Sequence, residues 1–298
     1  MAGRKTARRA AGPSGDAFVA LLGSSNATML RAIDTARRAA ASDATVLLVG
    51  ETGTGKRAIA AAMHAWSPRR AVPLVAVGPA ALPEELLRLD PRGGTLLLEE
   101  VGELPADVQA QLMRRLGHAG DGLDARIIAT TAHDLEGDVE AGRFRKDLFF
   151  HLSVVTIRVP SLRDRMEDLR ALSDGIVARL AERHHRHGLQ LAPDAHEALA
   201  RYDWPGNVRE LENTLERAVV LAQGDAITAQ DLGERVTTRR PPRTTAPAPV
   251  LDGCSLHDLE RRQIEHVLAS APTLGEAATQ LGIDPSTLYR KRKRLRLD

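Results

Sequence analysis

The sequence predicts an α/β domain with a mostly parallel sheet, followed by a helical region and a small all-α domain. Between residues 43 and 160, short apolar runs alternate with helical patterns, which is typical of a parallel sheet covered by helices. From about residue 162 to residue 232 only helical periodicity remains. After Ser255, three short helical patterns and a basic end are typical of a helix-turn-helix domain.

Five apolar runs are the expected strands of the sheet. Their apolar residues are continuous rather than alternating, as in strands that are buried on both faces. Their spacing leaves room for a helical connection between successive strands, as parallel pairing requires. The runs are TVLLV (45–49), PLVAV (73–77), TLLLE (95–99), RIIAT (126–130) and VVTIRV (154–159).

The same patterns give domain boundaries. Residues 16–162 are expected to form the α/β subdomain and residues 163–235 a helical subdomain. Residues 236–254 contain four prolines and no apolar periodicity, so we expect a semi-extended linker there. The terminal helical domain takes residues 255–298, and residues 1–15 are expected to be a basic, disordered tail.

Composition limits the class of protein. The chain has 298 residues and is 43% hydrophobic, enough for about two domains with real cores. Its apolar stretches are of strand length, far short of the roughly 20 residues of a membrane span, and no apolar segment follows the basic N-terminus as in a signal peptide. Cys254 is the single cysteine, which excludes an intrachain disulfide. We expect a cytoplasmic protein without a membrane partner.

The net charge of +2 hides an uneven distribution. Residues 290–298 carry a net charge of +5 and residues 1–15 a net charge of +4. The remaining body therefore carries −7. Basic ends on an acidic body favour a polyanionic partner at those ends, such as nucleic acid.

The segment GETGTGKR (50–57) follows the first expected strand and opens a helical pattern. Its spacing is that of a phosphate-binding loop, in which glycines aim backbone N–H groups at phosphate oxygens and a lysine reaches the β- and γ-phosphates. Arginine stands where the general pattern has Ser or Thr. We expect ATP binding by Gly50, Glu51, Thr52, Gly53, Thr54, Gly55, Lys56 and Arg57.

Two carboxylates end the third expected strand, in GTLLLEE (94–100). The carboxyl end of such a strand lies beside the phosphate loop in an open parallel sheet. There Glu99 is expected to hold Mg²⁺ with the nucleotide, and Glu100 to act as the catalytic residue that orients an attacking water. A strand that merely ends in solvated acids is the plainer alternative.

Four segments carry a family resemblance: GETGTGK, GGTLLLEEVGELP, GRFRKDL and above all YDWPGNVRELEN (202–213). Together they resemble the AAA+ module of bacterial sigma-54-dependent enhancer-binding activators. The resemblance runs from about Leu22 to Arg235 and continues into the terminal domain. It implies an AAA+ P-loop NTPase with a parallel sheet and a helical lid. In that family, ATP hydrolysis in a ring drives a surface loop against sigma-54 RNA polymerase.

The resemblance also implies roles for two arginines. Arg145, in GRFRKDL, matches one of two arginines that are offered to the γ-phosphate of a neighbouring subunit. Arg209, in NVREL, matches the lid arginine that reads the nucleotide state. A surface ion pair between Arg209 and Glu212 is the plainer alternative for the second. No receiver domain fits into the first forty residues, so no phosphorylation input is expected.

Departures from the family concern hydrolysis and its use. The GAFTGA motif that contacts sigma-54 is missing from residues 78–94. The Walker B aspartate is replaced by Glu99, and the second arginine by His151. The positions that resemble the switch and sensor asparagines hold Gly78 and Ala132. Because losing an arginine finger alone costs about 10³–10⁵ in rate, we expect weak or absent ATP hydrolysis. Because the GAFTGA motif is missing, we expect no sigma-54 loop contact.

The terminal domain is expected to bind DNA. Asp284 and Pro285 form a cap and a first-turn proline before the basic segment STLYRKRKRLR. This arrangement, which also resembles the Fis-type unit of the same family, places a basic helix for the major groove. A dimer on a palindromic operator is expected. The candidate DNA contacts are Ser286, Thr287, Tyr289, Arg290, Lys291, Lys293 and Arg294.

Three functional hypotheses remain after these observations. The first is a transcription regulator that binds ATP and DNA and assembles as a homo-oligomer, with RNA polymerase as a candidate partner. The second is an active ring ATPase that remodels sigma-54 RNA polymerase as an activator. The third is a DNA-binding protein whose AAA+ body is only a scaffold. Target genes, operator sequence, sign of regulation and input signal are not predicted.

Overall fold

The computed structural model describes residues 8–9, 24–82, 93–117, 124–237, 264, 267–268, 273–280 and 283–295. The chain divides into two compact units, Met1–Arg239 and Arg240–Asp298, and each is described by itself. No helix within the described ranges has the length and apolar character that a membrane crossing requires.

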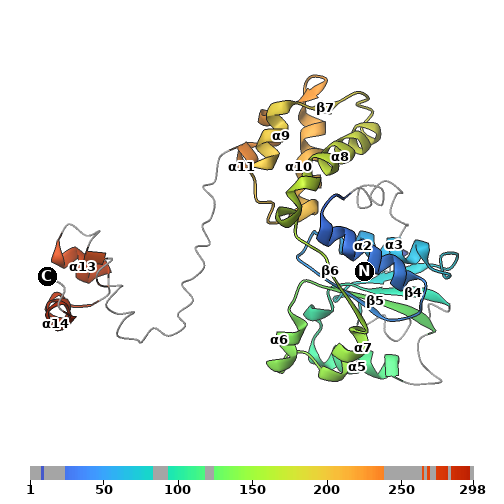
Figure 1. Ribbon diagram of the computed structural model, residues 1–298, viewed down its shortest axis with the longest axis horizontal. Helices are drawn as coiled ribbons and strands as arrows, with labels where there is room; N and C mark the ends of the chain where they lie inside the picture. Colours follow the sequence, from blue (N-terminus) through green and yellow to red (C-terminus); the bar gives the residue numbers. More distant parts are fainter. Residues whose placement is uncertain are drawn as a thin grey trace, which may run out of the picture. The chain divides into compact units, whose positions relative to one another are not determined.

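A six-stranded sheet forms the centre of the first unit, with the strand order β1-β3-β4-β5-β2-β6 (Figure 1). All pairs from β3 to β6 are parallel, as the continuous apolar runs predict. The strands span Leu74–Val77 (β3), Gly94–Leu98 (β4), Ala125–Thr131 (β5), Val46–Val49 (β2) and Val155–Arg158 (β6).

One strand contradicts the expectation of a disordered N-terminal tail. Arg8–Arg9 forms β1, which pairs antiparallel with β3 through Arg8↔Ala76 and Arg9↔Val75. Two arginines carry no β-strand pattern of their own, and the pairing uses the otherwise open edge of β3. The rest of the expected tail lies outside the described residues.

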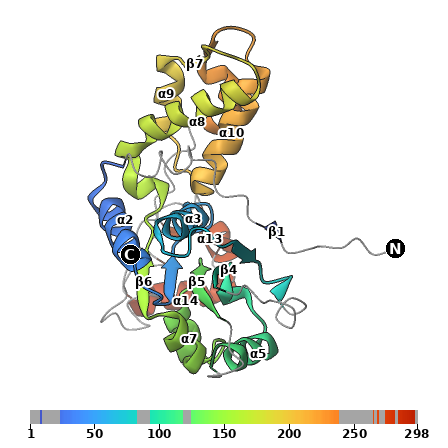
Figure 2. The ribbon, with the colours of Figure 1, turned by 90° about the vertical axis from the view of Figure 1, so that its right-hand side faces the viewer.

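Helices cover both faces of the sheet (Figure 2). Alternate residues of one strand enter different cores: Val46 and Leu48 pack with α2 and α3, whereas Leu47 packs with the helices of the other face. This two-sided burial explains why the strands read as continuous apolar runs. The covering helices are Ala27–Ala40 (α2) and Lys56–Trp66 (α3) on one face, and Ala106–Gly117 (α5), Leu135–Glu140 (α6) and Lys146–Leu152 (α7) on the other.

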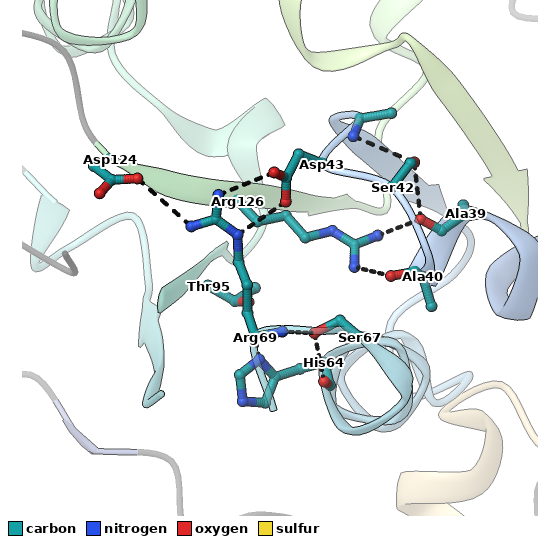
Figure 3. Close-up of polar contacts among 11 residues, drawn as sticks. Ala39, Ala40, Ser42, Asp43, His64, Ser67, Arg69, Thr95, Asp124 and Arg126 are labelled. Atoms are coloured by element: carbon teal, nitrogen blue, oxygen red, sulfur yellow. Dashed lines mark hydrogen bonds and ion pairs between the residues drawn. The ribbon is translucent and has the colours of Figure 1, made fainter. Parts of the chain in front are cut away.

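Polar contacts, buried at Arg126 and exposed at Asp43, join the segments at the amino ends of the strands (Figure 3). Arg126 at the start of β5 is 1% exposed and donates to the carbonyls of Ala40 (3.0 Å) and Ala39 (2.8 Å) at the end of α2. Nearby, Arg69 donates two hydrogen bonds to Asp43 (2.9 and 3.0 Å). The bonds from Arg69 lower the pKa of the Asp43 carboxyl, and burial lowers the pKa of the Arg126 guanidinium.

A helical lid completes the first unit, with its own core around Trp204, Leu211 and Leu215. Its first segment is the 3₁₀ helix η2, which leads directly into α8. The sequence predicts only helices here, yet Gln190–Leu191 (β7) and Ala226–Ile227 (β8) form a short parallel pair. Each strand has two residues, too few for a periodic signal. The other elements are Leu162–Asp168 (η2), Leu169–Arg183 (α8), Pro193–Ala200 (α9), Asn207–Leu221 (α10), Ala229–Leu232 (η3) and Glu234–Thr237 (α11).

The second unit contains the helices Leu274–Gln280 (α13) and Pro285–Leu295 (α14). Its small core joins Ile264 and Val267 to Ala277, Leu288 and Leu295. The alanines at the centre of α13 are buried, as expected for close helix packing. Most of the expected linker, from residue 238 onward, lies outside the described residues.

Candidate nucleotide-binding site and DNA-binding helix

The predicted phosphate loop forms the turn between β2 and α3. Gly53 (φ 83°) and Gly55 (φ 103°) adopt the left-handed conformation that glycine tolerates without strain. Thr54 closes the turn by donating to the carbonyl of Glu51 at 2.9 Å. The helix α3 therefore begins at Lys56 with its N-terminus at the loop, in the strand–loop–helix order that phosphate binding requires.

Lys56 lies inside this loop rather than in solvent. Its side chain is 6% exposed, and Nζ donates to the carbonyl of Gly50 at 2.6 Å and to that of Glu51 at 3.2 Å. The same Nζ lies 2.9 Å from Oε1 of Glu100. The lysine is thus held between the loop carbonyls and the acidic end of β4.

Glu100 is the more tightly held of the two carboxylates at the end of β4. Its backbone is left-handed (φ 49°), and its N–H donates to Oγ1 of Thr130 at 3.1 Å. Oε1 is paired with Lys56, and Oε2 accepts the N–H of Ala132 at 2.7 Å. Both carboxylate oxygens are fixed by neighbouring groups, and the Ala132 position contributes its backbone in place of a sensor side chain.

Glu99 is paired with Arg57, whose Nη1 lies 3.3 Å from Oε1 of Glu99. This carboxylate is the one predicted from sequence to hold Mg²⁺. Mg²⁺ is usually held by one or two carboxylates together with phosphates and water, but here the Glu99 carboxylate already has a guanidinium partner. Since Glu100 is also engaged by Lys56, this donor set does not fit a resident Mg²⁺.

The lid touches the phosphate loop through the buried side chain of Asn207. Its Nδ2 donates to Oε2 of Glu51 and to the carbonyl of Thr52, both at 3.1 Å. Its Oδ1 accepts the N–H of Leu162 at 2.7 Å. One side chain therefore joins the start of α10, the start of η2 and the phosphate loop. Asn207 was not among the site residues predicted from sequence, although it lies within the WPGNVREL segment.

Two further arginines fasten the loop to η2, and neither was predicted. Arg165 is 1% exposed and donates to the carbonyl of Thr54 at 3.0 Å; burial lowers the pKa of its guanidinium. Arg163 forms two hydrogen bonds to the carboxylate of Glu51, and these lower the pKa of that carboxyl. The only signal available from sequence was their position directly after the last strand.

Arg209 also contacts the phosphate loop from the lid. Its N–H donates to the carbonyl of Gly53 at 3.3 Å, and its side chain lines the cavity described below. The alternative partner, Glu212, pairs instead with Arg179 at 2.7 Å. The ion pair that competed with a nucleotide role for Arg209 is thus not formed.

A cavity of about 600 Å³ lies between the loop and the lid. It brings together most of the predicted nucleotide contacts: Thr52, Gly53, Thr54, Gly55, Lys56, Arg57, Glu99, Glu100 and Arg209. Leu172, Ile176 and Val208 add an apolar wall from the lid. A concave site that combines charged groups with apolar side chains is typical of small-molecule and cofactor binding.

Gly50 and Glu51 do not line this cavity, although both belong to the loop. A Cβ at position 50 would come within 2.6 Å of the carbonyl of Val159, so glycine is required there by packing. Gly78, at the position of the switch asparagine, does line the cavity, and a Cβ there would meet nothing within 4 Å. The space for a larger side chain is present but unused.

Arg145, the second predicted catalytic residue, is outside the cavity. It precedes α7, is 47% exposed and pairs with Asp147 at 2.7 Å. This hydrogen-bonded pairing raises the pKa of Arg145. The position is compatible with action on a neighbouring subunit and not on the nucleotide of the same chain. His151 is on the same short helix.

The helix α14 carries the predicted DNA contacts. Asp284 accepts the N–H of Ser286 at 2.9 Å, and its hydrogen bonds to Ser286 lower the pKa of its carboxyl, as expected for a helix cap. Leu288 and Leu295 face the core. Ser286, Tyr289, Arg290 and Lys293 are exposed, and Thr287 and Lys291 are half-buried. Arg294 lies on this helix, but its side chain is outside the described residues.

Comparison with known proteins gives three consecutive family matches. Residues 22–162 match the sigma-54 interaction domain. Residues 163–249 match an AAA+ ATPase lid domain. Residues 255–295 match the bacterial regulatory protein, Fis family. The AAA+ and helix-turn-helix assignments of the sequence analysis are therefore confirmed.

Similar curated proteins are transcriptional regulatory proteins. The alginate biosynthesis transcriptional regulatory protein AlgB of Pseudomonas syringae pv. tomato is 37% identical over 93% of this chain and 67% of its own length. The transcriptional regulatory protein ZraR of Escherichia coli K12 is 38% identical over 86% of this chain and 64% of its own length. The chain thus spans about two thirds of the length of these relatives.

Among solved structures, NtrX from Brucella abortus in complex with ADP is similar, with 30% identity and a TM-score of 0.65. The match covers 91% of this chain and 68% of NtrX. NtrX in complex with ATP matches with a TM-score of 0.64. With the family matches and the relatives, these findings show that the chain belongs to the family of sigma-54-dependent transcriptional regulators with AAA+ and Fis-type DNA-binding domains.

Proposed function

We propose that this protein is a transcription regulator that binds ATP or ADP between its loop and lid and hydrolyses ATP weakly or not at all. The observation that carries the proposal is the cavity in which Lys56, the strand-end carboxylates and Arg209 meet an apolar lid wall. Two structures of NtrX, in complex with ADP and with ATP, support nucleotide binding by this kind of module.

Weak hydrolysis is proposed from the partners of the groups that would perform it. Both oxygens of Glu100 are engaged, by Lys56 and by the Ala132 N–H. A general base must reach the water that it activates, and the bonds to Lys56 and to the Ala132 N–H restrict how the Glu100 carboxylate can move to do so. Mg²⁺ is not part of the proposal, because Glu99 is held by Arg57.

DNA binding is proposed for α14, with a palindromic operator bound by a dimer or a larger homo-oligomer. The exposed side chains of Ser286, Tyr289, Arg290 and Lys293 follow a helix cap, in the position of a recognition helix. Regulation without the sigma-54 loop motif is proposed from residues 78–94, where that motif is missing. Residues 83–92 of this interval lie outside the described residues.

A phosphate-release assay with parallel nucleotide titration tests the proposal. We expect the full chain to bind ATP and ADP, with turnover no faster than that of Lys56→Ala, both with and without operator DNA. Lys56→Ala should lose nucleotide binding, because it removes the cation at the centre of the loop. Turnover near that of typical enzymes, about 1–10³ s⁻¹, would contradict weak hydrolysis.

An active ring ATPase is the second candidate, and the position of Arg145 favours it. That arginine is half-exposed and outside the cavity of its own chain, as an arginine offered to a neighbour would be. Phosphate release that rises steeply with protein concentration and is lost in Arg145→Ala would support this candidate. Arg143→Ala is the control, since Arg143 is also an exposed arginine nearby and pairs with Asp138 as Arg145 pairs with Asp147.

A further inference from the structure

Two consecutive cations face two consecutive carboxylates at the mouth of the proposed nucleotide site. Lys56 pairs with Glu100 at 2.9 Å, and Arg57 pairs with Glu99 at 3.3 Å. Both cations belong to the first turn of α3, and both acids follow β4. The four charges cancel in pairs, so each carboxylate already has a cationic side chain as its partner before a ligand binds.

The second pair occupies the place where a nucleotide-bound metal is expected from sequence. Mg²⁺ requires nearly octahedral oxygen coordination at about 2.0–2.1 Å. To offer an oxygen, Glu99 would have to leave Arg57, and the freed guanidinium would then lie beside a divalent cation. The guanidinium and the metal are both positively charged, and such charges repel each other when they lie side by side. The arrangement therefore disfavours the metal.

The same arrangement suits a phosphate group. The Arg57 side chain is 55% exposed and lines the cavity together with Lys56 and Gly55. A guanidinium binds phosphate oxygens through two parallel hydrogen bonds, as it binds carboxylates. Arg57 is only loosely held by Glu99, at 3.3 Å, so exchange of the carboxylate for a phosphate requires a side-chain movement alone.

We propose that Arg57 serves as a built-in replacement for Mg²⁺, so that the site binds nucleoside di- and triphosphates without a divalent metal. The guanidinium supplies positive charge to the terminal phosphates, and Glu99 holds it in place before the nucleotide arrives. This inference rests on the proposed nucleotide binding, and it names the Arg57 guanidinium as the cation that accompanies the bound phosphates.

Calorimetric titration of the full chain with ADP and ATP, in excess EDTA and in excess Mg²⁺, tests this inference. We expect both nucleotides to bind in EDTA at least as tightly as in Mg²⁺, because a site that disfavours the metal must first separate it from the nucleotide in the Mg²⁺ condition. Arg57→Ser removes the guanidinium and supplies the hydroxyl of the general phosphate-loop pattern. It should bind at least about tenfold more weakly than the natural protein in EDTA and recover much of that loss in Mg²⁺.

Two control variants isolate the role of the guanidinium. Arg38→Ser removes an exposed arginine of α2 that pairs with Asp34, and it should leave both titrations unchanged. Arg57→Lys keeps the charge but not the two-pronged geometry, and its binding in EDTA should lie between those of the natural protein and Arg57→Ser. Thermal unfolding of each variant without nucleotide verifies that it is folded.

The outcomes separate this inference from the proposed function. Nucleotide binding that appears only with Mg²⁺, or an Arg57→Ser variant that binds as the natural protein does in EDTA, overturns the inference and leaves the proposed function standing. Absence of binding in both conditions overturns both. A third probe is Mn²⁺ with ADP: its paramagnetic resonance signal should change from that of the Mn²⁺–ADP complex toward that of free Mn²⁺ when an excess of the natural protein is added, and a signal from protein-bound Mn²⁺ would overturn the inference.

Discussion

Arginines have opposite roles at the two ends of the strands of the central sheet, which we call its amino edge and its carboxyl edge. At the amino edge, Arg126 is buried and donates to the fixed carbonyls of Ala39 and Ala40 (Figure 3). At the carboxyl edge, Arg57 is half-exposed, lines a cavity and pairs with Glu99 at 3.3 Å. Backbone carbonyls cannot exchange their donor for a ligand without opening the fold, whereas an ion pair at a cavity can.

A buried arginine that donates to backbone carbonyls is thus structural, whereas an exposed arginine that is paired with a carboxylate at a cavity is a candidate for ligand binding. Arg165 shows that position alone is insufficient: it is on the carboxyl side, but it is 1% exposed and donates to the carbonyl of Thr54. We therefore assign Arg165 to holding the loop. Arg57 and Arg209, which are exposed and line the cavity, are the arginines that we propose contact the ligand.

The largest expected effect comes from removing the amino-edge arginine. Arg126→Met should lower the free energy of unfolding by about 2–4 kcal/mol, because two buried carbonyls lose charge-assisted donors. Chemical denaturation at neutral pH measures this loss. Arg38→Met, an exposed change on α2, should stay within about 0.5 kcal/mol. Equal stability of Arg126→Met and the natural protein would show that the desolvation of the guanidinium cancels its hydrogen bonds.

An intermediate effect is expected where the loop meets the lid. Gly53 has φ 83°, and a Cβ there would lie 2.3 Å from the carbonyl of Gly206. Gly53→Ala should therefore cost about 1–3 kcal/mol of unfolding free energy and loosen the lid. Hydrogen exchange of α10 amides measures the second effect. Gly175→Ala, in α8 with nothing within 4 Å of the new Cβ, should instead stabilise by about 0.5–1 kcal/mol.

Unchanged exchange rates in α10 after Gly53→Ala would mean that the loop and the lid move independently. In that case a ligand bound at the loop could not change the stability of the lid, and the contacts at the carboxyl edge would not couple the two.

The smallest effect concerns the exposed part of the amino-edge network. Hydrogen bonds from Arg69 lower the pKa of Asp43 in the folded protein. A lowered folded-state pKa adds stability above the unfolded-state pKa, and that stability is lost as the pH falls through the folded-state pKa. Asp43 is 68% exposed, so Asp43→Asn should cost about 0.5 kcal/mol at neutral pH.

Denaturation midpoints between neutral pH and pH 3 verify this prediction. The difference between Asp43→Asn and the natural protein should shrink toward the acid end, where the carboxyl becomes protonated in both states. A difference that does not change with pH would assign the loss to packing instead of to the ion pair.

Sequence patterns predicted the sheet well because its strands are buried on both faces. The ends of the predicted runs 45–49 and 126–130 lie no more than one residue from the ends of β2 and β5. The phosphate loop was equally readable, since its glycines and lysine follow a fixed spacing. Both features are encoded by neighbouring residues and can therefore be predicted from one sequence.

What sequence did not predict depends on partners that are distant along the chain. Arg8–Arg9 becomes a strand only because the edge of β3 is available. The pairing of Arg57 with Glu99 joins residues 42 positions apart and depends on side-chain geometry. Asn207 contacts Glu51 across 156 residues. Local periodicity and residue propensity cannot predict contacts between residues so far apart in the sequence.

The contacts of Asn207 have a thermodynamic consequence for the whole first unit. Because one amide bonds simultaneously to Glu51, the carbonyl of Thr52 and the N–H of Leu162, loop order and lid attachment share a single coupling free energy. Such coupling is reciprocal. Whatever stiffens the loop must hold the lid more firmly by the same amount, and a protein or DNA contact that fixes the lid must tighten the loop around its ligand equally.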